Sequence, residues 1–493
     1  MSQDTVIRES DIDYIREQTG WSYLEMKWLS KEEAAKANRK RNALLQSLSG
    51  GVIKHFNDSK ISTGPLSPGC MTCGKGTWSC IFIGSLCTAN CFFCPQNRES
   101  KKNSPPNESG LIFDHAEDYV DYLEKFKFKG ASFSGGEPFL KFKEVLLFIK
   151  KIRAKLGKGI YIWVYTNGDL VDKNNLKVLK DAGLNEIRFD IAARKYSLKA
   201  VKMAVGIIDR VTVEIPAIPE DFEILKSILP KMKALGVARL NLHQLNATQQ
   251  CYRAFINRGY TFLHQPNIAI LESEMTALRL IKYALDKNIG LPINYCATAY
   301  KHRFQKKAYR RRFHSYIIEK YEDLTESGFI RRLSIQDVPE KIKKIIKMFQ
   351  AKKCHDGLWL FNEIGNELFF HHSLMNDMNF SRHHLIINYL TPLLTSVRDG
   401  ADENIREVSL NAGRNILIER KLLQTVKIKN PVAVRSFQEL YIEKMNEGDV
   451  FKRYYGSYAL KTKADINEMM KQKDNLCYLK IWELIGSGLY EIY

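Results

Sequence analysis

The chain has 493 residues, 45% of them hydrophobic, so it can form two or three domains with a sizeable core. Its 75 lysines and arginines outnumber 55 acidic residues, giving a net charge of +20. No apolar run reaches the roughly 18 residues of a membrane-spanning helix, and the start Met1-Ser2-Gln3-Asp4 does not have the pattern of a signal peptide. Clustered cysteines in such a chain favour a reducing compartment, so we expect a cytoplasmic protein with no membrane partner.

Residues 1–60 are expected to form a mostly helical N-terminal extension. The segment that follows carries Cys70, Cys73 and Cys80, and its Cys-x2-Cys-Gly pattern is typical of a metal knuckle. A closed zinc site normally takes four ligands, so Cys251, Cys296 or a non-cysteine group would have to complete the set. We predict a second metal site here, either zinc or an auxiliary iron–sulfur cluster. A set of idle or buried thiols is the alternative.

Cys87, Cys91 and Cys94 lie together in one short loop with C-x3-C-x2-C spacing. Thiolates this close converge on one metal centre, and a [4Fe–4S] cluster normally takes four cysteines. The loop supplies three, and no further cysteine follows before Cys251, so one iron would keep an open position. A zinc knuckle or a chance group of cysteines is the alternative interpretation.

A Gly135-Gly136-Glu137-Pro138 turn follows about forty residues later. It comes after the apolar segment Gly130–Phe133 and before an amphipathic helical pattern. Two glycines at a strand-to-helix turn let the backbone approach a ligand closely. Such a turn alone is a weak signal and often serves only to reverse the chain.

Six short apolar segments, rich in β-branched or aromatic residues, predict strands. They are Trp78–Leu86, Gly130–Ser134, Ile160–Thr166, Glu186–Ile191, Arg210–Ile215 and Arg239–Leu245. Helical patterns between them include Glu144–Leu156, Lys173–Ala182 and Asp221–Leu235. Alternating strands and helices indicate a parallel sheet.

The cysteine loop and the later Gly-Gly-Glu turn together resemble the radical S-adenosylmethionine (radical SAM) superfamily, nearest to proteins related to pyruvate formate-lyase activating enzyme. The resemblance covers about Cys70 to Cys296. It implies an α/β fold with a partial (β/α)6 barrel and a [4Fe–4S] cluster on Cys87, Cys91 and Cys94. It also implies that Gly135, Gly136 and Glu137 bind S-adenosylmethionine, and that cleavage of this cofactor releases a 5′-deoxyadenosyl radical.

Ligands of parallel α/β sheets bind at the carboxyl ends of the strands, and this rule nominates further residues. We expect Phe93, Thr166 and Asp190 to contact adenine and ribose, with Asn167 beside them. Weaker candidates are Glu214, His243 and Asn246. Each has a structural alternative: Asn167-Gly168 can be a simple turn, Asp190 a helix cap and His243 a core histidine.

The segment Lys301–Arg312 holds seven lysines and arginines interleaved with aromatic residues. On a helix Arg303, Lys307 and Arg310 would share a face, which could bind RNA or another anion. A solvated basic helix is the alternative. We place the barrel and its upstream cysteines at 61–312, and a small α+β accessory domain at 313–493.

The C-terminal domain is expected to contain a hairpin, three further elements of sheet and one helix. These are Leu358–Phe361 with Glu367–His371, then His384–Leu390, Arg406–Leu410 and Asn415–Leu423, and the helix Val432–Asn446.

We therefore expect a radical SAM enzyme that abstracts hydrogen from an anionic small molecule, with flavodoxin or ferredoxin as a low-potential electron donor. The modification of RNA or a protein is the second interpretation, and salt-dependent RNA binding would separate the two. A non-enzymatic iron–sulfur carrier or sensor is the third, but a carrier needs no Gly-Gly-Glu turn for the cofactor.

Overall fold

The computed structural model describes residues 23–96, 104–265, 267–352, 357–395, 404–445, 449–450 and 476–490. These residues form two compact units. The first comprises the chain up to Lys306 with the short segments Leu410–Arg414 and Ser487–Tyr493, and the second comprises Lys307–Ser409 and Asn415–Gly486. No helix in the described ranges is long and apolar enough to cross a membrane.

Seven parallel strands form the centre of the first unit, in the spatial order β4-β7-β8-β9-β10-β11-β14. Their bounds are β4 Trp78–Phe82, β7 Gly130–Ser134, β8 Tyr161–Thr166, β9 Glu186–Phe189, β10 Arg210–Pro216, β11 Arg239–His243 and β14 Ile293–Cys296. The first six are the predicted strands, each with ends shifted by a few residues at most. The seventh, β14, is four residues long and was not predicted.

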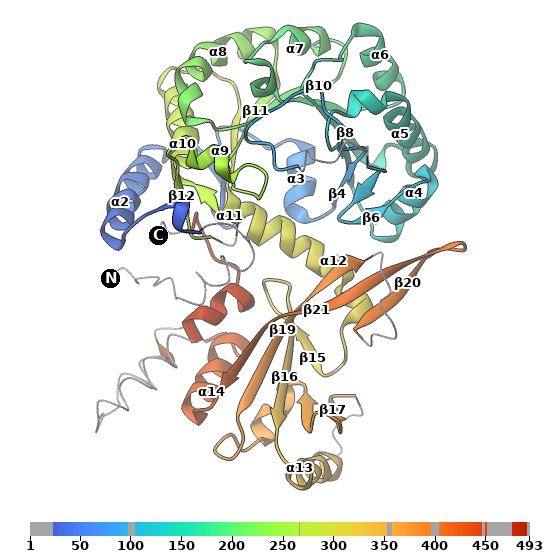
Figure 1. Cartoon of the computed structure of the whole chain (residues 1–493), viewed down its shortest axis with the longest axis vertical. Helices are drawn as coiled ribbons and strands as arrows, with labels where there is room; N and C mark the ends of the chain where they lie inside the picture. Colours follow the sequence, from blue (N-terminus) through green and yellow to red (C-terminus); the bar gives the residue numbers. More distant parts are fainter. Residues whose placement is uncertain are drawn as a thin grey trace. The chain divides into compact units, whose positions relative to one another are not determined.

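Helices cross over between successive strands and cover the outside of the curved sheet (Figure 1). They are α4 Ala116–Lys125, α5 Phe142–Leu156, α6 Lys173–Asp181, α7 Lys199–Ala204, α8 Phe222–Leu235 and α10 Leu271–Asp286. In α5 the buried residues Val145, Phe148, Ile149 and Ile152 recur at helical spacing, so one face of the helix packs on the sheet. The sheet and these helices form the partial barrel that the sequence predicted.

The expected helical extension is described only over residues 23–60, since residues 1–22 of that prediction lie outside the described ranges. Over residues 23–60 the long helix is α2 Lys31–Ser47, which begins at Ser30, and Ser30 forms a capping box with Glu33. Strand β1, Lys27–Trp28, joins β12, Thr261–Leu263, and β13, Ala269–Ile270, in a small separate sheet. The hairpin β2 Ile53–His55 and β3 Lys60–Ser62 pairs antiparallel with β14 and extends the barrel sheet. A further hairpin, β5 Asn107–Glu108 and β6 Leu111–Ile112, extends its other edge.

A short helix, α3 Pro68–Lys75, lies inside the arc of strands (Figure 1). Pro68 fills its first turn, Ser67 caps it by accepting the N–H of Cys70, and Gly76 ends it in a left-handed conformation (φ 74°). A Cβ atom on Gly69 would lie 2.4 Å from Nη2 of Arg188. The helix therefore packs directly against side chains of the barrel interior.

The second unit is an antiparallel sheet in the order β17-β18-β16-β19-β21-β20, with β15 paired to β16. The predicted hairpin is present as β17 Trp359–Asn362 and β18 Glu367–Phe370. The other predicted strands are β19 Leu385–Thr395, β20 Ile405–Asn411 and β21 Arg414–Ile428. The predicted helix is shorter, with α14 Pro431–Phe437 followed by a π-helical turn to Ile442.

Three elements in the described part of this unit were missed. Strand β15, Glu322–Leu324, and the central strand β16, Ile330–Gln336, lie near the start of the accessory domain that we placed at 313–493. Helix α13, Pro339–Ala351, buries Ile342 and Phe349 in the core of the unit. The unit thus combines an antiparallel sheet with helices, which is the α+β class that the sequence predicted.

Candidate active site

The predicted cluster ligands lie in the loop that follows β4. Cys87 is exposed, and Cys91 and Cys94 are partly buried. The loop turns back on itself because the N–H of Cys94 donates to the carbonyl of Cys91 at 3.2 Å. The side-chain amide of Asn167 donates to Cys87 Sγ at 3.7 Å. Three thiols with an N–H directed at sulfur suit an iron–sulfur cluster.

The Gly-Gly-Glu turn is paired with this loop by its backbone. The N–H of Gly136 donates to the carbonyl of Gly84 at 2.9 Å, and that of Glu137 to Leu86 at 2.8 Å. A Cβ atom on Gly135, whose φ is +119°, would lie 2.3 Å from the oxygen of Gly84. One on Gly136 would lie 1.9 Å from the oxygen of Leu86. Both glycines are therefore required by the close passage of the cysteine loop.

Glu137 is 3% exposed, and its carboxylate ties the turn to the end of β8. One oxygen accepts from Thr166 Oγ1 at 2.8 Å and the N–H of Phe139 at 3.1 Å, and the other accepts from the N–H of Asn167 at 2.8 Å. A carboxylate has about four acceptor sites, so about one remains for a ligand. Burial raises the pKa of Glu137 above its usual value, and the three hydrogen bonds oppose this.

Asn167 and Arg194 hold the cysteine loop from the other side. Asn167 Nδ2 donates to Thr88 Oγ1 at 3.0 Å. Arg194 Nη2 donates to the same oxygen at 2.7 Å and to the carbonyl of Thr88 at 3.1 Å. Its guanidinium also pairs with Asp169 at 2.7 Å. Sequence reasoning missed Arg194 and Thr88, although Arg194 lies just beyond the carboxyl end of β9, where site residues are expected.

Asp190 follows β9 and caps the 3-10 turn Ile191–Arg194. Its Oδ1 accepts hydrogen bonds from the N–H of Ala192 at 3.1 Å and of Ala193 at 3.4 Å. Asp190 is therefore a helix cap, which was the alternative interpretation of this residue. Burial raises the pKa of Asp190 to about 7, against the effect of the two N–H donors. Its Oδ2 has no hydrogen-bond partner among the described residues. It can therefore serve as cap and as ligand contact at once.

Phe93 packs at the edge of an apolar cluster on the other side of the loop. Phe92 and Phe93 meet edge to face with ring centroids 5.3 Å apart. The guanidinium of Arg258 lies 3.5 Å from the centre of the Phe92 ring. The buried thiol of Cys251 belongs to the same cluster and donates to the carbonyl of Asn246 at 3.7 Å. Asn246 thus contributes its backbone to this cluster.

Below the loop, a charged network fills part of the barrel interior. Glu214 on β10 pairs with Arg188 Nη1 at 2.9 Å and His243 Nε2 at 2.6 Å, and accepts from Asn241 Nδ2 at 2.8 Å. Burial alone would raise the pKa of Glu214, but the charges of Arg188 and His243 lower it well below its usual range. Burial also lowers the pKa of His243. Glu214 and His243 are therefore brought together, as the strand-end rule suggested.

The basic segment has a different arrangement from the one expected. Lys301–Lys306 form a π-helical turn, and the α-helix α12 spans Lys307–Ile317. Arg303 stacks 4.3 Å from the ring of Tyr490 and donates to the carbonyl of Gly488 at 2.5 Å. Arg310 is 6% exposed and donates twice to the carbonyl of Ser327. These two arginines therefore have intramolecular partners.

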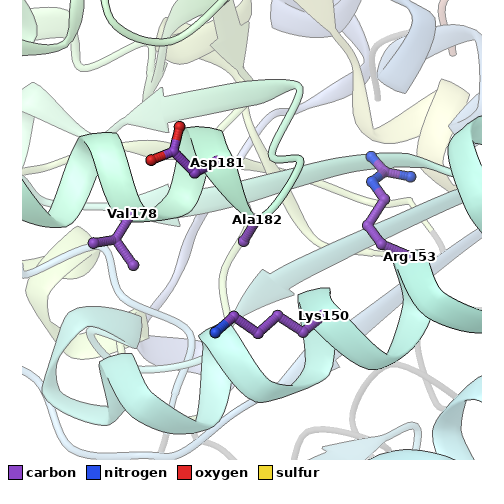
Figure 2. A pocket seen from close by; sticks show the side chains of 5 residues that line it. All are labelled: Lys150, Arg153, Val178, Asp181 and Ala182. Atoms are coloured by element: carbon purple, nitrogen blue, oxygen red, sulfur yellow. The ribbon is translucent and has the colours of Figure 1, made fainter.

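A surface hollow of about 400 Å³ lies between α5 and α6, on the outside of the barrel (Figure 2). It is lined by Lys150, Arg153, Val178, Asp181 and Ala182. Arg153 donates to the carbonyls of Gly157, Ile160 and Gly183, so its guanidinium supports the backbone. The hollow has no cysteine and lies on the helical layer, away from the strand ends.

Comparison with known proteins supports the assignment made from the loop and the turn. Residues 81–199 match the model of the Radical SAM superfamily. The chain is 28% identical over 301 residues to a putative glycyl-radical enzyme activating enzyme of Methanocaldococcus jannaschii. The match covers 58% of this chain and 78% of that protein.

Solved structures with some likeness include the radical S-adenosylmethionine methyltransferase TsrM from Kitasatospora setae, with 15% identity and a TM-score of 0.28. The match covers 38% of this chain and 40% of the TsrM chain. Methylornithine synthase (PylB) matches with 13% identity and a TM-score of 0.32. This match covers 59% of this chain and 83% of the PylB chain.

Proposed function

We propose that this chain, which belongs to the radical SAM superfamily, holds its [4Fe–4S] cluster on Cys87, Cys91 and Cys94 and binds S-adenosylmethionine beside Glu137. The observation that carries the proposal is the backbone pairing of the Gly135–Glu137 turn with the cysteine loop. When bound, the reduced cluster supplies the electron that splits S-adenosylmethionine into methionine and a 5′-deoxyadenosyl radical, which takes a hydrogen atom from the substrate.

Residues around the loop have distinct roles in this proposal. The remaining acceptor site of Glu137 receives the cationic amine of the cofactor, and Asn167 stabilises the thiolate of Cys87 by its N–H. The free Oδ2 of Asp190 accepts a ribose hydroxyl, while Phe93 offers an apolar face to adenine. A low-potential carrier such as flavodoxin or ferredoxin delivers the electron.

Lys301 favours a substrate with an anionic group. It follows β14 by five residues; burial lowers its pKa, and the charge of Glu214 opposes this effect. Its side-chain nitrogen makes no hydrogen bond or ion pair with any residue in the described parts of the chain. A partly buried amine without such a partner suits an anionic group, such as the carboxylate or phosphate of a small molecule.

The activation of a glycyl-radical enzyme is a second candidate function. Its support is the 28% identity to the putative activating enzyme of Methanocaldococcus jannaschii. In that case the hydrogen atom would come from a protein backbone rather than from a metabolite. The engagement of Arg303 and Arg310 within the chain gives less support to an RNA substrate.

The test is the formation of 5′-deoxyadenosine by the anaerobically reconstituted protein with dithionite and S-adenosylmethionine. We expect wild type to form it and the triple variant C87A/C91A/C94A to form none. Equal formation by this variant would overturn the proposal. A low-molecular-mass filtrate of cell extract should stimulate the reaction for a metabolite substrate, whereas stimulation only by the protein fraction would favour the activating-enzyme function.

A further inference from the structure

A second group of thiols meets inside the barrel. Cys70 and Cys73 lie three residues apart on α3 and so share one face of this helix. The helix is held closely in place, because a Cβ atom on Gly74 would lie 2.0 Å from the ring of Phe56. The glycine of the Cys-x2-Cys-Gly pattern therefore allows close packing against Phe56.

Cys296 joins this group from the last parallel strand. It ends β14 and is in register with Lys60 on the antiparallel strand β3. The ammonium of Lys60 donates to Cys296 Sγ at 2.7 Å. The same ammonium lies 4.0 Å from the centre of the Tyr300 ring.

Uncharged side chains direct further donors at all three sulfur atoms. The bonds are Gln305 Nε2 to Cys73 at 2.8 Å, Tyr300 OH to Cys73 at 3.2 Å, Asn294 Nδ2 to Cys296 at 3.4 Å and Asn241 Nδ2 to Cys70 at 3.7 Å. A neutral thiol is a weak acceptor, whereas an anionic sulfur attracts such donors. Hydrogen bonds to sulfur are also a regular feature of iron–sulfur sites.

Lys60 is a buried basic side chain beside this group. Its side chain is fully enclosed, with the residue only 1% exposed. No carboxylate of the described residues lies within 4.0 Å of its nitrogen. The amine therefore has a sulfur atom, and not a carboxylate, as its polar partner.

The spacing of the sulfurs is wider than a single metal ion requires. Across the described ranges, only Asp323, His371 and His372 in the second unit place three potential ligand atoms within 4.8 Å of one another. The thiols Cys70, Cys73 and Cys296 are not such a group. The loop thiols Cys87, Cys91 and Cys94 are not one either, so both sets of thiols are spread more widely than the ligands of a single ion.

We propose that Cys70, Cys73 and Cys296 ligate a second iron–sulfur cluster in the barrel interior, with Lys60 as its buried counter-charge. Cys80, the third cysteine of the upstream segment, lies on β4 in register with Ser132 on β7, and we assign the third position to Cys296, whose sulfur accepts the hydrogen bond of Lys60. Cys251 lies in the apolar cluster around Phe255. Three thiolates leave one iron of a cube free for another ligand. This cluster does not depend on cleavage of S-adenosylmethionine.

The test is the iron and sulfide content of variants that lack the loop thiols. C87A/C91A/C94A changes only exposed or partly buried side chains, so it should fold. After anaerobic reconstitution with ferrous iron and sulfide, we expect it to keep about four iron and four sulfide ions per chain. Adding C296A should reduce the content at least severalfold, and adding C80A, the matched control, should leave it unchanged.

Each outcome decides the inference. A folded C87A/C91A/C94A protein, checked by circular dichroism, that holds no iron or sulfide would overturn it. Retention of zinc without sulfide would replace the cluster by a single-ion site. An equal loss of iron with C80A and with C296A would show that Cys80 is also a ligand, which contradicts the assignment.

If C296A lowers the thermal stability of the metal-free protein, K60M provides the second variant, because it keeps every thiol and removes only the basic group beside them. We expect K60M to shift the reduction potential or lower the cluster content.

Discussion

A methyl group on Gly136 would overlap the carbonyl oxygen of Leu86, 1.9 Å from the position of its Cβ. For G136A we therefore expect the cysteine loop to move, at a cost of about 1–3 kcal/mol in stability. Displacement of the thiols should lower the reconstituted iron content and weaken S-adenosylmethionine binding about tenfold, which is 1.4 kcal/mol. Iron analysis and calorimetric titration measure the two effects.

Gly159 provides the matched control for this change. It has no atom within 4 Å of its Cβ position and lies outside the left-handed region. G159A should therefore leave iron content and cofactor affinity at wild-type values. If G136A behaves like G159A, the glycine pair is not needed for the passage of the loop.

Asp190 predicts a specific dependence of stability on pH. Its pKa is about 7 in the folded protein and about 3.9 in an unfolded chain. Between these values the folded state holds the proton more tightly, so the contribution of Asp190 to stability falls as pH rises from about 4 to about 7. D190N keeps an oxygen for the cap and removes this titration.

Urea unfolding at pH 5 and at pH 7 measures the effect. We expect the stability of D190N relative to wild type to rise by about 1 kcal/mol per pH unit at most, because the side chain is partly exposed. A stability difference independent of pH would show that Asp190 is ionised throughout.

Single residues differ in how well the sequence predicts them. Cys87, Cys91 and Cys94 are close in the chain, and the Gly135–Glu137 turn has a fixed spacing from them, so local pattern was sufficient. Lys60 and Cys296 are 236 positions apart. Their contact depends on the pairing of β3 with β14, which no local pattern encodes.

At the scale of elements, Arg310 on α12 provides structural support. It is buried, donates Nε and Nη2 to the carbonyl of Ser327, and lies 4.0 Å from the centre of the Phe329 ring. R310Q should therefore destabilise the second unit by about 1–3 kcal/mol, because a buried carbonyl loses its partners. Urea unfolding measures this cost.

The exposed Lys343 on α13 is the control in the same unit. K343Q should change stability by no more than about 0.5 kcal/mol. The affinity for a single-stranded RNA and its salt dependence should be the same in R310Q and wild type. Weaker RNA binding by R310Q at unchanged stability would instead support an anion-binding role for the basic segment.

Periodic elements were predicted well and short ones poorly. The six predicted strands of the barrel are apolar, and five of them are followed by turn residues and a helix, so the alternation was visible. Strand β14 has only the sequence Ile-Asn-Tyr-Cys, and β3 reads Lys-Ile-Ser. Their polar residues are buried by contacts inside the barrel, which is tertiary information. Strand β16 carries Arg331 and Arg332, so its charge concealed a central strand.

At the scale of the whole molecule, every residue of the candidate site belongs to the first unit. Reconstituted protein with S-adenosylmethionine should therefore show slower amide hydrogen exchange at residues 84–96, 134–137, 166–169 and 190–194. Ligand binding stabilises the folded states that bind the ligand, by about 2.7 kcal/mol when the free ligand concentration is 100 times Kd. Mass spectrometry of peptide fragments measures this.

The sheet of the second unit, from β16 to β21, provides the internal reference for the same experiment. Its exchange rates should not change with the cofactor. Protection confined to this sheet would place the cofactor elsewhere and contradict the proposed site.

The pairing of β3 with β14 also has a consequence for the order of biosynthesis. The loop thiols and the Gly-Gly-Glu turn are complete once the ribosome has passed residue 137. Cys70 and Cys73 must wait for Cys296, more than two hundred residues later. Iron delivered during translation would therefore meet the outer loop first, and the interior cluster would form only as the last strand closes the sheet.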